Sequence, residues 1–414
     1  MQAVILAAGQ SSRFYPYNSF GHKSLTVLGG KSLFLKTLES IREAGIKNIV
    51  VVEDSSQLIS KSLSEDDIKD VKIQFVIQEN PTGMGDALLC ARFCLEEKFF
   101  LVNAYHFEFS NFVKDFNDAQ KSEGDLVLLT KEEKDVSDFG SFERVNGKLV
   151  VSEKKEGKNL ERIVGIYLLN KKFVDILHNE EKNHYSFENA LSSYSQNNEI
   201  ILLSAKKETL SLKYPWDLLT VKDYILNSIK SHKAHSAQVS EKAVITGEVY
   251  VDDGATVMDG AVIVGPAYIG KNAYIGTNAI IRGGVCIEER VVVGAHMEVK
   301  NSVIMRGTTT HSGFIGDSVI GEKTSLAAGF ISGNVRLDKE EVEVLVKGKK
   351  VSSHRKYFGT IIGSNSALGI KIGTMPGVVI GNNVLVGPST TVMENIEDHT
   401  TYYTEFKAIV KKDK

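Results

Sequence analysis

Continuous apolar runs alternate with amphipathic stretches over the first 225 or so residues of this 414-residue chain. Apolar runs without alternation are typical of strands buried on both faces, and hence of a largely parallel sheet covered by helices. Between the runs, Phe34, Leu38 and Ile41 have helical spacing, and Gly45 is a natural helix end. The pattern therefore predicts an α/β domain over residues 1–225. Its expected strands span residues 3–8, 47–53, 71–77, 99–104 and 124–130.

The periodicity changes after residue 225. Residues 218–232 have the spacing of a connecting helix, and we expect its end to form a linker at 226–236. From Val239 onward an aliphatic residue, and finally Met305, recurs at every sixth position. A period of six indicates the hexapeptide parallel β-helix, in which three short strands form each triangular coil around an aliphatic core. We therefore expect a β-helix over 237–400 and a polar C-terminal tail over 401–414. The repeat positions are Val239, Ile245, Val251, Val257, Ile263, Ile269, Ile275, Ile281, Ile287, Val293, Val299 and Met305.

A charged insertion at about residues 338–357 interrupts the repeats, which lapse near 307–316 and return at Ile362. Acidic residues and lysines, among them Lys347, dominate the insertion, so we expect a solvated excursion from the coils. In a solenoid such excursions usually lie on one face and often carry the binding site.

Composition narrows the classes of function. The net charge of −3 argues against a general nucleic-acid surface, and we expect no nucleic-acid partner. The N-terminus enters a strand at once, so we expect neither an export signal nor a membrane segment. Cys90, Cys94 and Cys286 lack zinc-type spacing and read as reduced residues of a cytoplasmic protein.

A small, polar loop follows the first expected strand, with the sequence Ala7-Ala8-Gly9-Gln10-Ser11-Ser12-Arg13. Ala, Gly and Ser leave the backbone N–H groups open to close approach by a polyphosphate, and Arg13 and Lys23 supply positive charge. The alternative is a strand that ends in a surface turn with two unrelated cations.

Further motifs follow the loop in order. They are Gln78-Glu79-Asn80-Pro81-Thr82-Gly83-Met84-Gly85, Phe139-Gly140-Ser141, Glu153-Lys154 and Tyr214-Pro215-Trp216-Asp217. Together with the opening loop they resemble the sugar-1-phosphate nucleotidyltransferases, whose pattern is LAAG-x-G-T-R…P…K, then Q…GT-G-x-A, then E-K-P. With the appended repeats the chain is similar to the bifunctional type, exemplified by the uridylyltransferase/acetyltransferase that makes UDP-N-acetylglucosamine and by its archaeal relatives. The resemblance implies a Rossmann-like domain with a mixed, mainly parallel sheet, followed by a left-handed parallel β-helix.

The resemblance also implies a reaction and its residues. A nucleoside triphosphate, UTP or dTTP, would react with a sugar-1-phosphate in the presence of Mg²⁺, giving an NDP-sugar and pyrophosphate. The implied phosphate-binding residues are Ala8, Gly9, Arg13 and Lys23, and those that read the base are Gln78 and Gly83. The implied residues for the sugar phosphate are Gly140, Glu153 and Lys154, and Asp217 would bind Mg²⁺.

The repeats contain a second motif, His311-Ser312-Gly313-Phe314-Ile315-Gly316-Asp317-Ser318, which is similar to the acetyltransferase stretch H-x-x-Y-x-G-D-S. The resemblance implies that His311 removes a proton from a sugar amine that attacks acetyl-CoA, with Asn334 and Lys356 nearby. Phe314 replaces the Tyr of this stretch. Further along, Ser325 stands where the resemblance expects an Asn, Ala327 where it expects a Gly, and Tyr357 where it expects a Lys. The alternative for a lone histidine in a solenoid turn is a polar surface residue.

Tyr105 stands where the resemblance expects an Asp as the other metal ligand, and a neutral phenol is a poor substitute for a carboxylate. His106 or Glu108 could replace it. The alternative function is a catalytically impaired, NDP-sugar-binding regulatory or scaffolding homologue. Because β-helices of this kind commonly form trimers, the resemblance further implies a homotrimer.

Overall fold

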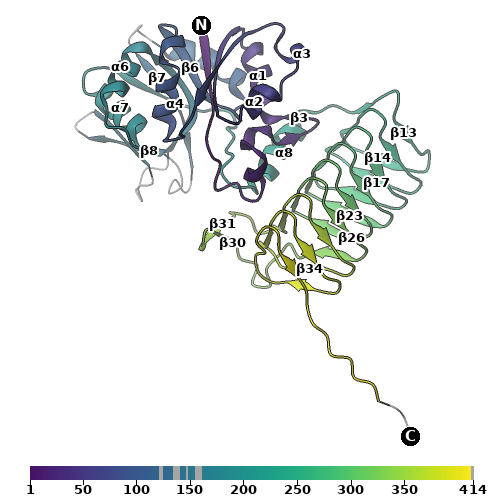
Figure 1. The fold of residues 1–414 in the computed structure, drawn as a ribbon. Coiled ribbons are helices and arrows are strands. Elements are labelled where there is room, and N and C mark those ends of the chain that lie inside the picture. The colour runs from purple at the N-terminus through teal and green to yellow at the C-terminus, as the bar shows by residue number, and fades with distance from the viewer. Residues whose placement is uncertain (121–124, 134–139, 146–147, 154–160, 412–414) are drawn as a thin grey trace. The chain divides into compact units, whose positions relative to one another are not determined.

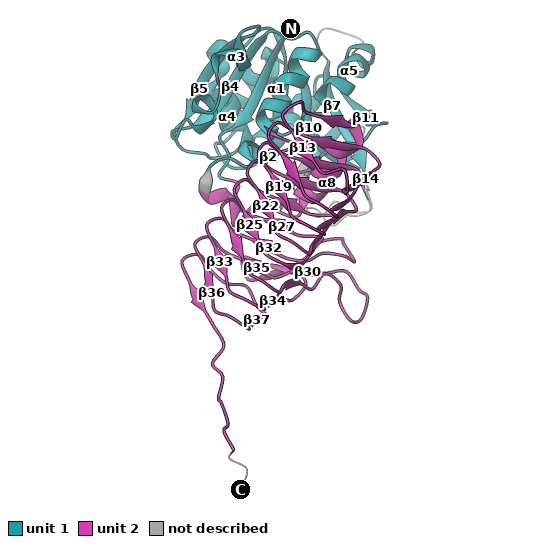
Figure 2. Cartoon of the chain, turned by 90° about the vertical axis from the view of Figure 1, so that its right-hand side faces the viewer, with its two compact units in different colours: residues 1–10, 21–26, 31–210 teal, residues 11–20, 27–30, 211–414 magenta. Residues whose placement is uncertain are grey.

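The structure is a computed structural model that describes residues 1–120, 125–133, 140–145, 148–153 and 161–411 (Figure 1). The chain divides into two compact units (Figure 2). Unit 1 comprises residues 1–10, 21–26 and 31–210, and unit 2 comprises residues 11–20, 27–30 and 211–414. The domain limits expected at residues 225 and 237 remain predictions, and the segment from Ser211 onward groups with the repeats.

Unit 1 is built on one mixed sheet with the strand order β11-β7-β10-β6-β1-β4-β5. The strands are β1 (Gln2–Ala7), β4 (Asn48–Asp54), β5 (Lys72–Gln78), β6 (Lys98–Asn103), β7 (Leu126–Glu132), β10 (Glu161–Asn170) and β11 (Ile200–Ser204). Only β10 runs antiparallel to its neighbours β6 and β7 along this path. The expected α/β fold with a mixed, mainly parallel sheet is therefore confirmed.

Helices cover the sheet because alternate strand residues point to opposite faces. In β1, Val4 and Leu6 join one buried cluster, whereas Ala3 and Ile5 join the other. The helices of unit 1 are α1 (Leu33–Glu43), α2 (Leu58–Lys61), α3 (Glu65–Ile68), α4 (Met84–Cys90), α5 (Val113–Ala119), α6 (Lys171–Asn179) and α7 (Ser186–Ser195). Helix α1 starts at the cap Ser32, whose side chain accepts a hydrogen bond from the Leu35 backbone N–H, as N-caps do.

In unit 2 the helix α8 (Asp217–Ser228) is followed along the chain by three parallel sheets, which form the expected β-helix. The first sheet contains β12 (His232–Lys233), β15 (Val249–Val251), β18 (Ala267–Ile269), β21 (Val285–Ile287), β24 (Val303–Ile304), β27 (Val319–Ile320), β32 (Ile361–Ile362) and β35 (Val379–Ile380). The second contains β13 (Gln238–Val239), β16 (Thr256–Val257), β19 (Tyr274–Ile275), β22 (Val292–Val293), β25 (Thr309–Thr310), β28 (Ser325–Leu326), β33 (Ala367–Leu368), β36 (Leu385–Val386) and β38 (Thr401–Tyr402). The third contains β14 (Val244–Thr246), β17 (Val262–Val264), β20 (Ile280–Arg282), β23 (Met297–Lys300), β26 (Gly313–Gly316), β29 (Phe330–Ser332), β34 (Gly373–Thr374) and β37 (Thr391–Val392).

The six-residue period predicts most of the aliphatic core of the coils, with two exceptions. Ile245, in the first coil, is 37% exposed. At the last predicted position Met305 is buried, but Ile304 instead of Met305 belongs to the core cluster of the coils. Ile287 pairs with Ile304, one residue closer in sequence than Ile269 is to Ile287, so this coil is one residue shorter and the repeat shifts.

The charged insertion forms a β-hairpin, β30 (Glu343–Val346) and β31 (Lys349–Ser352), with Lys347 and Gly348 in its turn. Val342 and Val344 are buried although most of the hairpin is exposed, so the insertion is anchored by apolar contacts. In the described part of the chain, no helix has the length and apolar character needed to cross a membrane.

Candidate active site

Several of the predicted nucleotide-binding residues lie at one edge of the sheet in unit 1. Strands β1, β4, β5 and β6 are parallel, so their carboxyl ends share an edge. Ala8 and Gly9 follow β1, Gln78 ends β5, and Asn103 ends β6. Ligands of open α/β sheets bind outside this edge. The fold therefore brings these motifs together in the place where such sheets bind their ligands.

His22, which is a neutral histidine, directly precedes the cation Lys23 near this edge. His22 is buried, and its Nδ1 lies 2.7 Å from Ser24 Oγ. Burial, and to a smaller extent the neighbouring charge of Lys23, lower the pKa of His22 from 6.5 to about 3. Lys23 therefore supplies the positive charge of this segment, and His22 supplies an uncharged ring.

Tyr105 occupies the position where a metal ligand was expected, and the ammonium group of Lys23 lies over its ring. The Nζ of Lys23 lies 4.6 Å from the centroid of the Tyr105 ring, which is a cation–π arrangement. The Tyr105 ring also lies against His106, with centroids 4.6 Å apart. Where a carboxylate was expected to face a metal ion, the structure has an aromatic ring that faces an ammonium group.

His106 and Glu108, the possible replacements, are engaged with each other. His106 Nδ1 lies 2.8 Å from Glu108 Oε1, which also accepts a hydrogen bond of 2.9 Å from the Leu210 backbone N–H. Both side chains are almost completely buried. His106 Nε2 and Glu108 Oε2 are buried atoms for which the described residues provide no hydrogen-bond partner. His106 and Glu108 thus contact each other in the interior of unit 1.

Gln78 and Gly83, the residues predicted to read the base, are held in place by contacts with other residues of unit 1. Gln78 is buried, and its Nε2 donates a hydrogen bond of 2.6 Å to Asp86 Oδ2 in the first turn of α4. Gly83 caps α4 with a φ of +126°, and a Cβ at this position would lie 3.2 Å from the carbonyl oxygen of His184. Glycine is required there by both the backbone conformation and the close packing.

Two of the predicted sugar-site residues are neighbours across a hairpin. Gly140 in β8 (Gly140–Val145) pairs with Glu153 in β9 (Lys148–Glu153) in the antiparallel register. The backbone therefore places both at the same end of this hairpin. Lys154 lies outside the described residues.

Arg13 belongs to unit 2, where the residues 11–20, called the signature loop below, are held by the coils. Tyr15 donates a hydrogen bond of 2.8 Å to Asp398 Oδ1, and Tyr17 donates to the carbonyl oxygens of Val319 and Ile362. Asn382 Nδ2 donates to the carbonyl oxygen of Pro16 at 2.8 Å. The sequence gives no signal for these contacts, because the partners are more than 300 residues apart.

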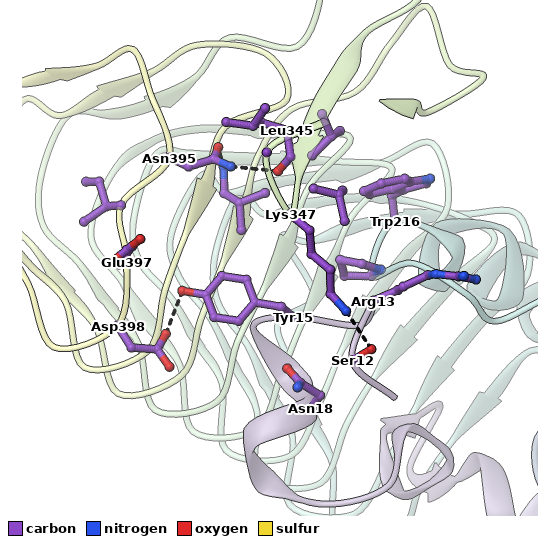
Figure 3. A pocket seen from close by; sticks show the side chains of 16 residues that line it. Ser12, Arg13, Tyr15, Asn18, Trp216, Leu345, Lys347, Asn395, Glu397 and Asp398 are labelled. Carbon is purple, nitrogen blue, oxygen red and sulfur yellow. Dashed lines mark hydrogen bonds between the residues drawn. The ribbon is translucent and has the colours of Figure 1, made fainter. Parts of the chain in front are cut away.

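A cavity of about 660 Å³ in unit 2 is lined by Arg13 and by Lys347 of the insertion (Figure 3). Lys347 Nζ donates a hydrogen bond of 2.9 Å to Ser12 Oγ in the signature loop. Sequence reasoning noted the charge of the insertion and the tendency of such excursions to carry sites, but it missed the contact of Lys347 with this loop.

Asp217 is the first residue of α8. Its Oδ2 accepts hydrogen bonds from the backbone N–H groups of Lys213 at 2.6 Å and Tyr214 at 2.9 Å. The adjacent Trp216 stacks on Tyr214, with ring centroids 4.4 Å apart and planes 9° apart. The carboxylate is thus held in a fixed orientation by its own turn.

The described residues contain no group of three or more His, Cys, Asp and Glu side chains arranged to hold a metal ion. Of the two expected metal carboxylates the sequence retains Asp217, while Tyr105 faces a cation. This donor set does not fit a cage of protein ligands. It fits a Mg²⁺ ion bound through a single carboxylate and substrate phosphates, which is a common mode for Mg²⁺.

The expected acetyl-transfer residues lie outside the strands of the β-helix, with His311 before β26 and Asn334 after β29. His311 is exposed, and Lys356 is exposed. Asn334 Nδ2 donates a hydrogen bond of 2.6 Å to the buried Asp317, which also lies 3.2 Å from Lys300 Nζ. The described hydrogen bonds join neither Asn334 nor Lys356 to His311. Lys300 and Asp317 are the charged pair that the sequence reasoning did not assign.

Comparison with known proteins matches both parts of the chain. Residues 2–233 match the family model described as Nucleotidyl transferase, and residues 263–332 match the GMPPB C-terminal domain. A protein of Methanococcus aeolicus, named Bifunctional protein GlmU, is 32% identical over 422 residues, covering 99% of each chain. One of the same name from Methanococcus vannielii is 31% identical over the whole of both chains. A Sulfurisphaera tokodaii protein, named Bifunctional sugar-1-phosphate nucleotidylyltransferase/acetyltransferase, is 29% identical over 96% of this chain and 98% of its own.

Proposed function

As the chain belongs to the nucleotidyl transferase family, we propose that it transfers a nucleotidyl group from UTP or dTTP to a sugar-1-phosphate. The observation that carries this proposal is the arrangement of Ala8, Gly9, Gln78 and Lys23 in unit 1. The first three lie at the carboxyl edge of one parallel sheet, and Lys23 covers Tyr105, just beyond the end of β6. The product is an NDP-sugar, and the leaving group is pyrophosphate.

In the proposed reaction an oxygen of the sugar-1-phosphate attacks the α-phosphorus of the triphosphate, and the bond from that phosphorus to the bridging oxygen of the leaving pyrophosphate breaks. The protein contributes positioning and charge neutralisation, since no covalent nucleophile is needed. Backbone N–H groups at Ala8 and Gly9, with Lys23 and Arg13, bind the phosphates. The remaining proposed contacts are Gln78 and Gly83 with the base, and Gly140, Glu153 and Lys154 with the sugar phosphate.

Members of this family generally use a divalent metal ion. We assign Asp217 as the protein ligand of Mg²⁺, which when bound neutralises phosphate charge. The retained carboxylate supports this assignment, and the backbone hydrogen bonds to Asp217 Oδ2 fix its orientation.

The test is pyrophosphate release measured over a panel of sugar-1-phosphates with UTP and dTTP. We expect release with at least one pair, and a loss of about 100-fold or more in Lys23→Ala, because a charged phosphate contact is removed. Lys36→Ala, on helix α1, is the matched control. The second candidate, an NDP-sugar-binding regulatory or scaffolding protein, is favoured by Tyr105. No release with any pair, together with tight NDP-sugar binding, would establish that second candidate and exclude the enzyme.

We further propose acetyl transfer from acetyl-CoA to an amino-sugar-1-phosphate in the β-helix, with His311 as general base and with Asn334 and Lys356 assisting. The full-length similarity to proteins named as bifunctional supports it. His311→Ala is expected to lower thiol release from acetyl-CoA by about 100-fold or more, in line with loss of a general base. His296→Ala, at another exposed turn, is the control. Unchanged thiol release in the His311 variant would remove this residue from the mechanism.

A homotrimer through the β-helix and a cytoplasmic location complete the proposal. The outer face of the third sheet carries an aliphatic column in which Val244, Val262 and Ile280 are aligned in register. Val244 is 52% and Ile280 38% exposed, so the column offers apolar area to a second copy. Among the described residues the three cysteines form no disulfide, which supports a reducing compartment.

A further inference from the structure

The cavity of about 660 Å³ beside the signature loop is formed entirely by residues of unit 2 (Figure 3). Segments far apart in sequence line it. They are Ser12, Arg13, Tyr15 and Asn18 of the signature loop, Pro215 and Trp216, residues 344–348 of the insertion hairpin, Val379, and residues 395–398. The space is large enough for a phosphorylated ligand, and one of its walls is apolar, with Trp216, Val344 and Val346.

Two cations of this cavity, Arg13 and Lys347, form no ion pair within the described part of the chain. Among the described residues, no carboxylate lies within ion-pair distance of Arg13 or of Lys347, although Lys350 on the same hairpin pairs with Glu343 at 3.3 Å. The hydrogen bond from Lys347 goes to a neutral group, Ser12 Oγ. Figure 3 shows Lys347 extending toward Ser12 beside Arg13. Arg13 and Lys347 therefore line the cavity without forming an ion pair to any described carboxylate, although Glu397 and Asp398 also line it.

Two carboxylates, Asp398 and Glu397, also line the cavity, and they differ in their surroundings. Asp398 accepts hydrogen bonds from Tyr15 Oη at 2.8 Å and from the Asn382 backbone N–H at 2.6 Å, so donors of the protein satisfy it. Desolvation by burial and the hydrogen bond to Asp398 raise the pKa of Tyr15, which therefore stays a donor at neutral pH. Glu397 is exposed to solvent.

We infer that this cavity binds a polyphosphate group, and that Lys347 of the insertion hairpin is a phosphate-binding residue beside Arg13. The guanidinium of Arg13 can bind two phosphate oxygens at once, and Lys347 adds a second positive charge. The apolar wall lowers the local dielectric and strengthens both contacts. This inference rests on the proposed function, because Arg13 is the residue proposed there for the triphosphate. It adds a contribution of the β-helix to binding of the terminal phosphates.

The test uses Trp216, the single tryptophan of the chain, whose emission reports on the cavity that it lines. The full chain is titrated with pyrophosphate at constant ionic strength, and binding is measured in parallel by equilibrium dialysis. We expect a saturable change in emission and weaker binding at higher salt. Lys347→Ala is expected to weaken pyrophosphate binding by about 10- to 100-fold, as for the loss of a charge-assisted hydrogen bond.

Three controls sharpen this experiment. Lys350→Ala removes a lysine from the same hairpin and is expected to bind pyrophosphate as the wild type does. Lys347→Arg keeps the charge and is expected to restore most of the affinity. A non-hydrolysable nucleoside triphosphate is expected to show the same dependence on Lys347, whereas a nucleoside monophosphate, which lacks the terminal phosphates, is not.

Pyrophosphate binding that is absent by both methods, or that is equal in Lys347→Ala and the wild type, would overturn the inference. Its failure is distinguishable from failure of the proposed function, since binding needs no turnover. A protein that binds pyrophosphate through Lys347 but releases none from any substrate pair supports the cavity assignment and contradicts the proposed reaction. Turnover in a protein whose pyrophosphate binding does not depend on Lys347 supports the proposed reaction and contradicts the cavity assignment.

Discussion

Three consecutive links connect residues of unit 1 near the carboxyl edge of its sheet: His22 precedes Lys23, Lys23 covers the Tyr105 ring, and that ring lies against His106. Of the adjacent residues His22 and Lys23, Lys23 carries the positive charge at neutral pH, since burial keeps the pKa of His22 low. Tyr105 therefore acts here as a platform for a cation. This differs from the metal-binding role that the corresponding carboxylate would have.

The first residue-scale prediction concerns this platform. Tyr105→Ala removes the ring below Lys23 and is expected to lower kcat/KM for pyrophosphate release by about 2- to 30-fold, the equivalent of a cation–π contact of about 0.5–2 kcal/mol. Tyr105→Phe keeps the ring and should stay within about twofold of the wild type. Equal losses in both variants would show that the hydroxyl group matters instead.

The second residue-scale prediction is a pH dependence of stability. The folded pKa of His22 is about 3 and its ordinary value is 6.5, so between these values the unfolded chain binds a proton that the folded chain does not. The free energy of unfolding should therefore fall as the pH falls from about 6.5 toward 3, by about 1.4 kcal/mol per pH unit at most from this group. Above pH 6.5 the contribution is constant. Urea unfolding of the wild type and of His22→Asn from pH 4 to pH 8 measures it, and parallel curves would contradict it.

At the scale of elements, strands of the second sheet such as β19 and β22 place one side chain in the core and its neighbour toward solvent. On β19, Ile275 is completely buried and Tyr274 is 37% exposed. Ile275→Ala is expected to lower the free energy of unfolding by about 2–5 kcal/mol, because it leaves a cavity in a packed core. Tyr274→Ala, one position away, should cost much less. Thermal or urea unfolding compares the two, and similar losses would argue against the inward direction of Ile275.

The core residues of the β-helix could be predicted from the sequence because the coils repeat with a regular period. Ile263, Ile275 and Ile281 were predictable as core residues because every coil imposes the same local demand. Ile304 joins the core cluster in place of Met305 because the loss of one residue in a turn shifts the frame without any local signal. The contacts of the insertion and of Tyr17 could not be predicted, because they join residues that no period relates. The motifs proposed for the reaction were recognised from residue types and their order, whereas the Lys23–Tyr105 contact could be seen only in the structure.

At the scale of the whole molecule, the exposed column of the third sheet predicts association. We expect a sedimentation mass near three times the chain mass of 45.5 kDa. Ile280→Asp places a charge in the column and should shift the protein toward monomers. Val292→Asp, at a position of similar exposure on the second sheet, is the control. A monomeric wild type would contradict the proposed trimer.

The hydrogen bonds of the signature loop limit how the chain can be shortened. The carbonyl oxygens of Val319 and Ile362 and the side chains of Asn382 and Asp398 hold the loop, and all four residues lie beyond residue 233, where the match to the nucleotidyl transferase family ends. A fragment that ends there keeps every motif of the first domain, yet it lacks the partners that order Arg13 and its neighbours. In this protein the C-terminal coils are therefore part of the folding template of an N-terminal loop. A recombinant or evolutionary exchange of one half for that of a relative would have to carry the loop and its partner carbonyls together.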